Sequence, residues 1–286
     1  MRYEIVDKEG YQEKVKEIKD DSTLEKIIKN LEKEKEILNR QVQDLSKRQP
    51  LQQHFSGKRI RIGIISDTHK GSLYANQNLE DSLINYFNKS KVDVVYHVGD
   101  LVDGEKMYRG HEYEIEIPGA DAQVNHFVET FPKVNSKMYF IIGNHDRSFW
   151  KNAGVDVGKQ IAEHRDDMEY LGQDQATIEI SSNTKIMLIH PDGGTAYAVS
   201  YKSQKLIESF TGGEKPNIML CGHFHKYDHI FYRNIHGFQV PTTCSQTPFM
   251  KRKPTPAIMG GLMLDVYTNK KGIDKLKIEY LPYYET

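Results

Sequence analysis

Five short polar clusters stand along this chain, and each follows a run of apolar, largely β-branched residues. The clusters are Asp67-Thr68-His69, Gly99-Asp100-Leu101-Val102-Asp103, Gly143-Asn144-His145-Asp146, His190, and Gly222-His223-Phe224-His225. Short apolar strands that alternate with helix-like segments are typical of an α/β fold. Open α/β sheets carry their ligand sites at the carboxyl ends of the strands. We therefore expect the five clusters to meet in one site.

The apolar pattern from Arg59 onward predicts the elements of this fold. Two buried strands over 60–66 and 92–98 flank an amphipathic helix over 76–87, which makes a parallel βαβ unit. The later runs are short and predict a second sheet that is richer in antiparallel pairing. The remaining predicted elements are a strand over 138–142, a helix over 155–165, paired strands over 176–180 and 184–189, and strands over 218–221, 230–235, 257–266 and 276–281.

Charge and length exclude several classes of protein. The 286 residues suit one large domain or two modest ones. The 39 Lys plus Arg balance 40 Asp plus Glu, which disfavours a globally basic nucleic-acid binder and an acidic tail protein. No apolar run approaches the ~18–20 residues that cross a bilayer. Two cysteines make no disulfide framework, and the charged N-terminus lacks the core of a signal peptide, so we expect a soluble, cytoplasmic protein.

The first 50 residues differ in composition, with 12 basic and 12 acidic residues. The apolar residues of this segment form a heptad seam that consists of Leu24, Leu31, Leu38 and Leu45 with Ile28 and Val42, while Lys35 takes an intervening position. Such a seam favours a short coiled coil with a second copy or a partner; the alternative is a single helix packed on its own domain. We predict a helical coiled-coil segment over 1–50, a linker over 51–58 and the α/β domain over 59–286.

The five clusters together offer carboxylate, imidazole and amide groups. These are the hard-to-borderline ligands that suit Mn²⁺, Fe or Zn²⁺. A single Asp-x-His or His-x-His is more often a turn or a hydrogen-bonded surface pair. Five clusters in this order, each after an apolar strand, indicate a metal site.

The same series resembles the calcineurin-like metallophosphoesterase superfamily, and the resemblance covers about residues 59 to 266. It implies two packed mixed β-sheets flanked by helices, a four-layer sandwich, and a dinuclear metal centre. It assigns Asp67, His69 and His225 to one metal ion, Asn144, His190 and His223 to the other, and Asp100 to both. Two divalent ions are expected, with Mn²⁺ favoured and Fe or Zn²⁺ as alternatives, and they would attack the phosphate ester through a bridging hydroxide.

Two further residues match catalytic positions of the superfamily. His145 stands where the family contacts phosphate and protonates the leaving oxygen, a role that suits imidazole because it titrates near neutrality. Asp103 matches the carboxylate that orients this histidine.

Departures from the pattern bear on the branch of the family. Phosphoprotein phosphatases usually carry arginine and glutamate where this chain has Gly104 and Asp146. The Gly-Asn-His-Asp version is more typical of phosphodiesterase and nuclease branches, including recombination-repair exonucleases and the small subunit of archaeal DNA polymerase D. His190 is followed by Pro191 where the family usually has glycine, which affects the loop rather than the ligand.

Substrate contacts are expected on two loops. Tyr108, Arg109 and His111 follow the second cluster, and Lys251 and Arg252 follow Phe249 in a later loop. Cations and aromatic rings near metals suit the backbone and bases of single-stranded DNA. The alternative for both loops is ordinary solvated surface.

Three functions are compatible with these residues. The favoured one is a metal-dependent phosphodiesterase, specifically a DNA nuclease, whose coiled coil forms a homodimer or docks a partner protein. The second is a phosphomonoesterase that acts on a phosphoprotein or a small metabolite. The third is a noncatalytic assembly subunit, against which the complete set of ligands argues. A dinucleotide-binding or P-loop enzyme is disfavoured because neither glycine motif follows the first strand.

Overall fold

The computed structural model describes residues 26–33, 35, 50–53, 55 and 59–284. Residues 26–33 and 35 are helical and exposed, and they include Ile28 and Leu31 of the predicted seam. The other seam leucines and Val42 lie outside the described residues. The coiled coil therefore stays a prediction.

One six-stranded mixed sheet has the order β12-β11-β2-β3-β4-β5. Strands β2 to β5 run parallel to one another, while β11 and β12 run antiparallel to their neighbours. The strands are β2 (Arg59–Ile65), β3 (Val94–Val98), β4 (Lys137–Ile142), β5 (Met168–Gln173), β11 (Gly260–Asn269) and β12 (Gly272–Pro282). The helices that connect the parallel strands are α3 (Gln77–Ser90), α4 (Ala120–Thr130), α5 (Asn144–Ala153) and α6 (Val157–His164).

The second six-stranded sheet has the order β1-β6-β7-β8-β10-β9. Its strands are β1 (Leu51–Gln52), β6 (Gln175–Ser181), β7 (Thr184–Ile189), β8 (Ile218–Cys221), β9 (Asp228–Tyr232) and β10 (Ile235–Gln239). Helix α7 (Tyr201–Ser209) connects β7 to β8. Three short helices lie in loops: η1 (His111–Tyr113), η2 (Gly212–Glu214) and α8 (Pro248–Arg252).

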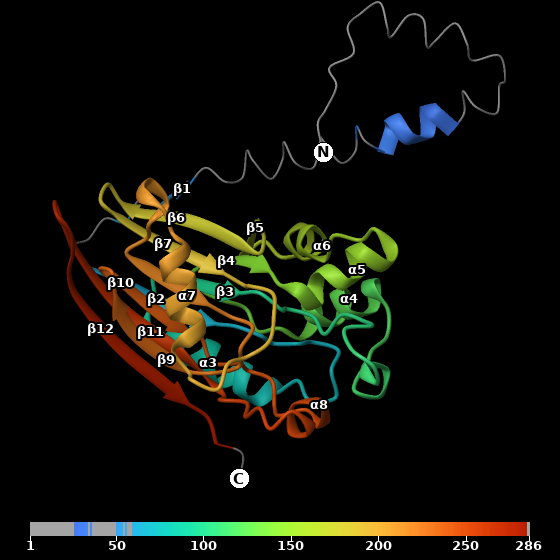
Figure 1. Ribbon diagram of the computed structural model, residues 1–286. Coiled ribbons are helices and arrows are strands. Elements are labelled where there is room, and N and C mark those ends of the chain that lie inside the picture. Colours follow the sequence, from blue (N-terminus) through green and yellow to red (C-terminus); the bar gives the residue numbers. More distant parts are fainter. Residues whose placement is uncertain (1–25, 34, 36–49, 54, 56–58, 285–286) are drawn as a thin grey trace, which may run out of the picture. The chain divides into compact units, whose positions relative to one another are not determined.

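Apolar side chains join these elements into four layers. Alternate residues of β2 and β3, such as Ile62 and Tyr96, pack against Leu188 and Leu220 of the other sheet. On the outer face of the first sheet, helices α3 to α6 bury residues such as Phe87. Helix α7 covers the outer face of the second sheet, where Ile207 of the helix belongs to one apolar cluster with Met219 of β8. Figure 1 shows the helices on the outside of the two stacked sheets, which confirms the predicted α/β sandwich.

Three expectations from the sequence were wrong. Residues 230–235 are not one strand, because Arg233 and Asn234 adopt left-handed backbone angles and turn the chain from β9 into β10. The second sheet is not richer in antiparallel pairing, since each sheet contains three parallel and two antiparallel pairs. The runs 257–266 and 276–281 form β11 and β12, which extend the first sheet.

Other elements were absent from the prediction. Strand β5 has a broken apolar alternation, with Gly172 near its end, and β1 is two residues long, so neither has a clear period. Strand β1, which pairs with β6, lies inside the stretch 51–58 that was predicted as a linker. Within the part of the chain that the structure describes, no helix is long and apolar enough to span a bilayer.

Candidate functional site

The strand ends bring the five clusters together at one edge of the sandwich. Asp67, Asp100 and Asn144 follow β2, β3 and β4 of the first sheet, in that order. His190 and His223 follow β7 and β8 of the second sheet. Direct contacts join the two sets across the sheets, because His190 Nε2 lies 3.0 Å from Asp100 Oδ2 and His225 Nε2 lies 3.3 Å from Asp67 Oδ1.

Asp67, His69 and His225 present their polar atoms to one point. His69 Nε2 and His225 Nε2 are 3.2 Å apart, and each faces Asp67 Oδ1, at 3.9 Å and 3.3 Å. Donor atoms that share one cation at about 2.1 Å lie roughly 3.0–3.5 Å from one another. The three side chains therefore fit a divalent ion.

Asp100, His190 and His223 form a second such group, in which one ligand atom from each residue lies within 4.8 Å of the other two. The ring of His190 is oriented by its Nδ1, which lies 2.6 Å from the carbonyl oxygen of Val98. His223 Nε2 lies 2.6 Å from the carbonyl oxygen of Gly193, which leaves Nδ1 for the cluster. Hydrogen bonds of this kind fix the tautomer of a ligating histidine.

Asn144 lines the same cavity as Asp100 and His223, and its side-chain oxygen lacks a partner. Among the described residues, Asn144 Oδ1 is buried without a hydrogen bond, whereas the Asp100 carboxylate lies 3.0 Å from His190 Nε2. A buried polar atom without a partner is costly, and a cation would satisfy Asn144 Oδ1. The residues of this site thus fit a pair of divalent ions.

Backbone strain is concentrated in the same place. The left-handed φ values are 56° at Asp67, 46° at His69, 54° at Asp100, 78° at His223 and 53° at His225. Residues other than glycine seldom adopt such angles, and those that do cluster at functional sites. Close approach explains two glycines, since a Cβ at Gly99 would lie 2.4 Å from His190 Nδ1 and one at Gly143 would lie 2.3 Å from Asp100 Oδ1.

The electrostatics of the cluster keep its aspartates ionised and favour protonation of two of its histidines. Burial opposes ionisation of Asp67 and Asp100, but the facing His225 and His190 hold the pKa of each carboxyl well below its usual range. Burial also opposes protonation of His69 and His190, yet the surrounding carboxylates raise their pKa values to about 9 and about 10. The carboxylates thus make the site attractive to cations, whether protons or metal ions.

His145 and Asp103 meet differently from the predicted arrangement. His145 Nδ1 lies 2.5 Å from the main-chain oxygen of Asp103, whereas the nearer carboxylate oxygen is 3.8 Å away. The carboxylate instead contacts His69 Nδ1 at 3.3 Å and His111 Nε2 at 3.1 Å. The main chain of Asp103 therefore orients His145, and its side chain orients His69.

His111 was predicted as a substrate contact, but its side chain is fully buried behind Asp103. Its ring lies against Tyr108 and does not line the cavity that opens onto the candidate metal ligands. These ligands, here called the metal-ligand cluster, are Asp67, His69, Asp100, Asn144, His190, His223 and His225. His111 contacts the Asp103 carboxylate, which contacts Nδ1 of His69, and the Nε2 atom on the far side of the His69 ring faces the candidate metal position. The sequence signal for this role was only the closeness of His111 to the second cluster.

We expect His111→Phe to weaken Mn²⁺ binding about tenfold, because outer-shell partners of ligating histidines set ring orientation and basicity. Calorimetric titration of the metal-free protein with Mn²⁺ measures the effect. His111→Gln keeps a donor and should lose less, while His164→Phe, an exposed position, should bind as the wild type does. An unchanged affinity in His111→Phe would disprove the positioning role.

Asp146 is buried beneath the cluster, and its role was missed. Its carboxylate accepts hydrogen bonds from the main-chain N–H groups of Leu101, Val102 and Gly143. Burial and the nearby Asp100 nevertheless raise the pKa of Asp146 to about 7. The side chain ties the loop after β3 to the start of α5, which sets the spacing of Asp100 and Asn144.

A second brace holds the loop that contains Pro191. Arg147 lies 2.7 Å from Asp192 and 2.9 Å from Asp174. Asp192 precedes Gly193, whose carbonyl accepts the His223 hydrogen bond. One ion pair thus joins the unusual loop after His190 to α5, and this loop carries the acceptor that orients one ligand.

A cavity of about 490 Å³ opens onto the cluster. Tyr108 lines it with its ring stacked on Phe249, 3.9 Å between centroids, and Lys253 lines it beyond α8. The predicted contacts Arg109, Lys251 and Arg252 are exposed and do not line this cavity. Lys251 and Arg252 belong to α8 rather than to a loop, and Arg252 lies 3.7 Å from Glu114.

Comparison with known proteins gives a family and a set of similar folds. A family model described as the calcineurin-like phosphoesterase superfamily domain matches residues 60–237. No curated protein matches the chain in sequence.

Three solved structures illustrate the similarity. A novel archaeal phosphodiesterase is 18% identical with a TM-score of 0.46, over 78% of this chain and 100% of that one. The phosphoesterase YfcE from E. coli is 15% identical with a TM-score of 0.42, over 76% and 98%. Vps29 from Entamoeba histolytica complexed with zinc is 12% identical with a TM-score of 0.39, over 78% and 99%.

Proposed function

Because the chain belongs to the calcineurin-like phosphoesterase superfamily, we propose that it is a metal-dependent phosphodiesterase with a dinuclear centre. The observation that carries the proposal is the convergence of two groups of metal-ligand atoms on one cavity, with Asp100 between them. Asn144 Oδ1, which has no hydrogen-bond partner among the described residues, supports the second ion in particular.

We assign the ligands as the family pattern implies, and the two groups of facing side chains support this assignment. Asp67, His69 and His225 would hold one ion, Asn144, His190 and His223 would hold the other, and Asp100 would contact both. Divalent ions there would polarise the phosphoryl oxygens of a substrate and activate water at neutral pH. Mn²⁺ is the favoured metal, and Fe or Zn²⁺ would accept the same ligands.

His145 acts on the substrate side of this centre. Burial lowers the pKa of His145 to about 4, so the ring is neutral at neutral pH. Its Nδ1–H donates to the main-chain oxygen of Asp103, which leaves Nε2 free to accept a proton. A bound phosphate anion would stabilise the protonated ring, which could then donate that proton to the leaving oxygen.

The finer proposal is that the substrate is DNA. The cavity at the cluster carries a stacked pair of aromatic rings, Tyr108 and Phe249, and the cation Lys253. Aromatic rings and cations together suit a nucleic-acid strand. On the heptad pattern alone, we further propose that the N-terminal segment forms a homodimer or docks a partner protein.

Hydrolysis of bis-p-nitrophenyl phosphate against p-nitrophenyl phosphate, each with Mn²⁺, tests the reaction. We expect a clear preference for the diester, lost in His223→Ala and kept in the exposed control His164→Ala. Labelled single- and double-stranded oligonucleotides then test DNA cleavage. A preference for the monoester would contradict the phosphodiesterase proposal and favour a phosphoprotein or metabolite, while inactivity with bound metal would favour a noncatalytic subunit.

A further inference from the structure

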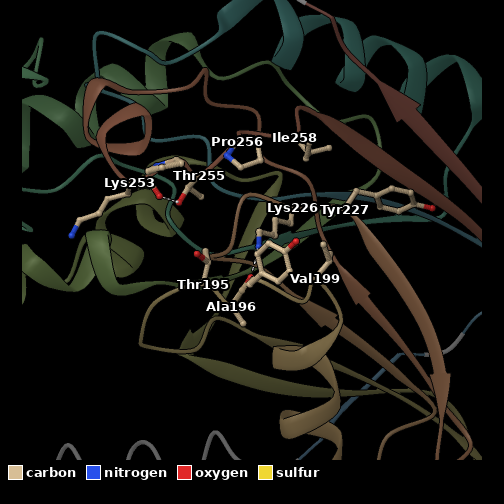
Figure 2. Close-up of a pocket in the computed structure, with 11 residues that line it drawn as sticks. Thr195, Ala196, Val199, Lys226, Tyr227, Lys253, Thr255, Pro256 and Ile258 are labelled. Carbon is tan, nitrogen blue, oxygen red and sulfur yellow. Dashed lines mark hydrogen bonds between the residues drawn. The ribbon is translucent and has the colours of Figure 1, made fainter.

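A second cavity of about 530 Å³ adjoins the one at the metal-ligand cluster. Thr195, Lys253 and Thr255 line both cavities, so they form a common wall. In Figure 2, Thr255, Pro256 and Ile258 lie on one side, Thr195, Ala196 and Val199 lie opposite, and Lys226 lies between them, while the ring of Tyr227 points away from these side chains. A substrate larger than a phosphate group has room to extend from the first cavity into the second.

Each wall of the second cavity is anchored to the metal-ligand cluster. Lys226 and Tyr227 directly follow His225. Thr195 follows the glycine pair whose first carbonyl accepts the His223 hydrogen bond. On the third side, the main-chain N–H of Ile258 donates to the carbonyl of His225 at 2.9 Å. The segments that position the ligands therefore also line the second cavity.

The chemistry of the lining indicates what enters. The described residues that line the cavity include two lysines and no acidic side chain, so an anion is favoured. Lys226 Nζ donates to the carbonyl of Ala196 at 2.9 Å, which fixes the ammonium beside the cavity. Tyr197 is fully exposed, and Tyr227 is held by stacking on Tyr280, with ring centroids 4.1 Å apart.

Rings and cations together match one class of ligand. Aliphatic substituents would use the apolar surface without the rings, and a bare phosphate would use the lysines alone. A nucleotide uses both, because its base stacks on an aromatic side chain while its phosphate pairs with a cation at the wall that the two cavities share, where Lys253 lies. We propose that this cavity is a nucleoside subsite, which receives the base of a phosphodiester whose phosphate lies at the metal-ligand cluster; this inference rests on the proposed phosphodiesterase function.

Two diesters with the same leaving group separate the subsite from the reaction. Thymidine 5′-(p-nitrophenyl phosphate) carries a nucleoside, and ethyl p-nitrophenyl phosphate carries none. We expect kcat/KM to be about tenfold or more higher for the nucleoside ester in the wild type, a factor typical of one stacked base. Tyr197→Leu and Lys226→Met should each lower this ratio about tenfold, mainly through KM. Tyr201→Leu and Lys205→Met change exposed residues of α7 and should keep the wild-type ratio.

Binding without turnover makes the test independent of catalysis. Calorimetry should show that thymidine 5′-monophosphate binds about tenfold tighter than ethyl phosphate, with the difference lost in Tyr197→Leu and Lys226→Met. If both esters are cleaved with equal kcat/KM and both phosphates bind equally, the subsite is disproved and the phosphodiesterase survives. If neither ester is cleaved but the nucleotide still binds tighter, the subsite stands and the proposed reaction fails.

Discussion

Replacing Asp100 with Asn is expected to lower kcat/KM for bis-p-nitrophenyl phosphate by about 10³-fold or more. Asp100 is buried between the two ligand groups, and its carboxylate is the proposed ligand of both ions. Asn keeps an oxygen that can accept the hydrogen bond from the His145 main chain, so the loop geometry should survive. The lost negative charge weakens metal binding, and metal ions supply several kcal/mol of transition-state stabilisation, hence the size of the effect.

Elemental analysis of the same variant should find fewer metal ions per chain than in the wild type. Asp166→Asn is the matched control, because the Asp166 side chain is 90% exposed and belongs to neither group of candidate metal ligands. Full activity in Asp100→Asn with unchanged metal content would overturn the assignment of Asp100 as the shared ligand.

Lys70→Met is expected to destabilise the protein by about 3–5 kcal/mol, the usual cost of leaving one partner of a buried ion pair alone. Lys70 Nζ lies 2.7 Å from Glu80 Oε2, and both side chains are at most 2% exposed. The pair joins α3 to the loop that carries His69. The double variant Lys70→Met with Glu80→Leu should recover most of the loss, because it leaves no unpaired charge in the interior.

The cost of Lys70→Met should also depend on pH. Burial raises the pKa of Glu80 to about 7 from an ordinary value of 4.5, even with Lys70 beside it. A carboxyl whose native pKa is raised stabilises the fold below its unfolded pKa, and that stability is lost as pH rises through the native pKa. Removing Lys70 raises this pKa further, so the destabilisation should be larger at pH 8.5 than at pH 6.

Urea unfolding of the chelator-treated protein measures both effects, since bound metal would otherwise add stability of its own. Lys133→Met is the control, because the Lys133 side chain is 76% exposed and its contact with Asp166 is 3.8 Å long. A cost below about 1 kcal/mol for Lys70→Met at pH 8.5 would show that the pair contributes little.

The parts of the fold with a clear local pattern could be predicted from the sequence. Strands β2, β3 and β4 are continuous apolar runs with a polar cluster after each, and the rule that ligands gather at strand ends places the clusters together. The turn at Arg233 and Asn234 has a weaker signal, because only Asn234 is of a residue type that favours the left-handed angles that both residues adopt. Sheet membership of β11 and β12 likewise depends on long-range pairing rather than on local sequence.

The candidate site divides in the same way. Residues inside the five motifs could be named because a motif carries its chemistry within a few positions. The partners of those residues come from elsewhere in the chain, as with His111 on Asp103 or Gly193 on His223. Single cations and rings, such as Lys226 and Tyr197, can be recognised as candidate binding residues only when the fold places them around one cavity.

Binding of Mn²⁺ to the metal-free protein, followed by electron paramagnetic resonance, distinguishes a dinuclear from a mononuclear centre. We expect two Mn²⁺ per chain and a spectrum of an exchange-coupled pair, because Asp100 is the proposed ligand of both ions. Asn144→Ala, which removes a ligand of the second ion only, should give one Mn²⁺ and an uncoupled spectrum. A single uncoupled Mn²⁺ in the wild type, or none, would contradict the dinuclear centre.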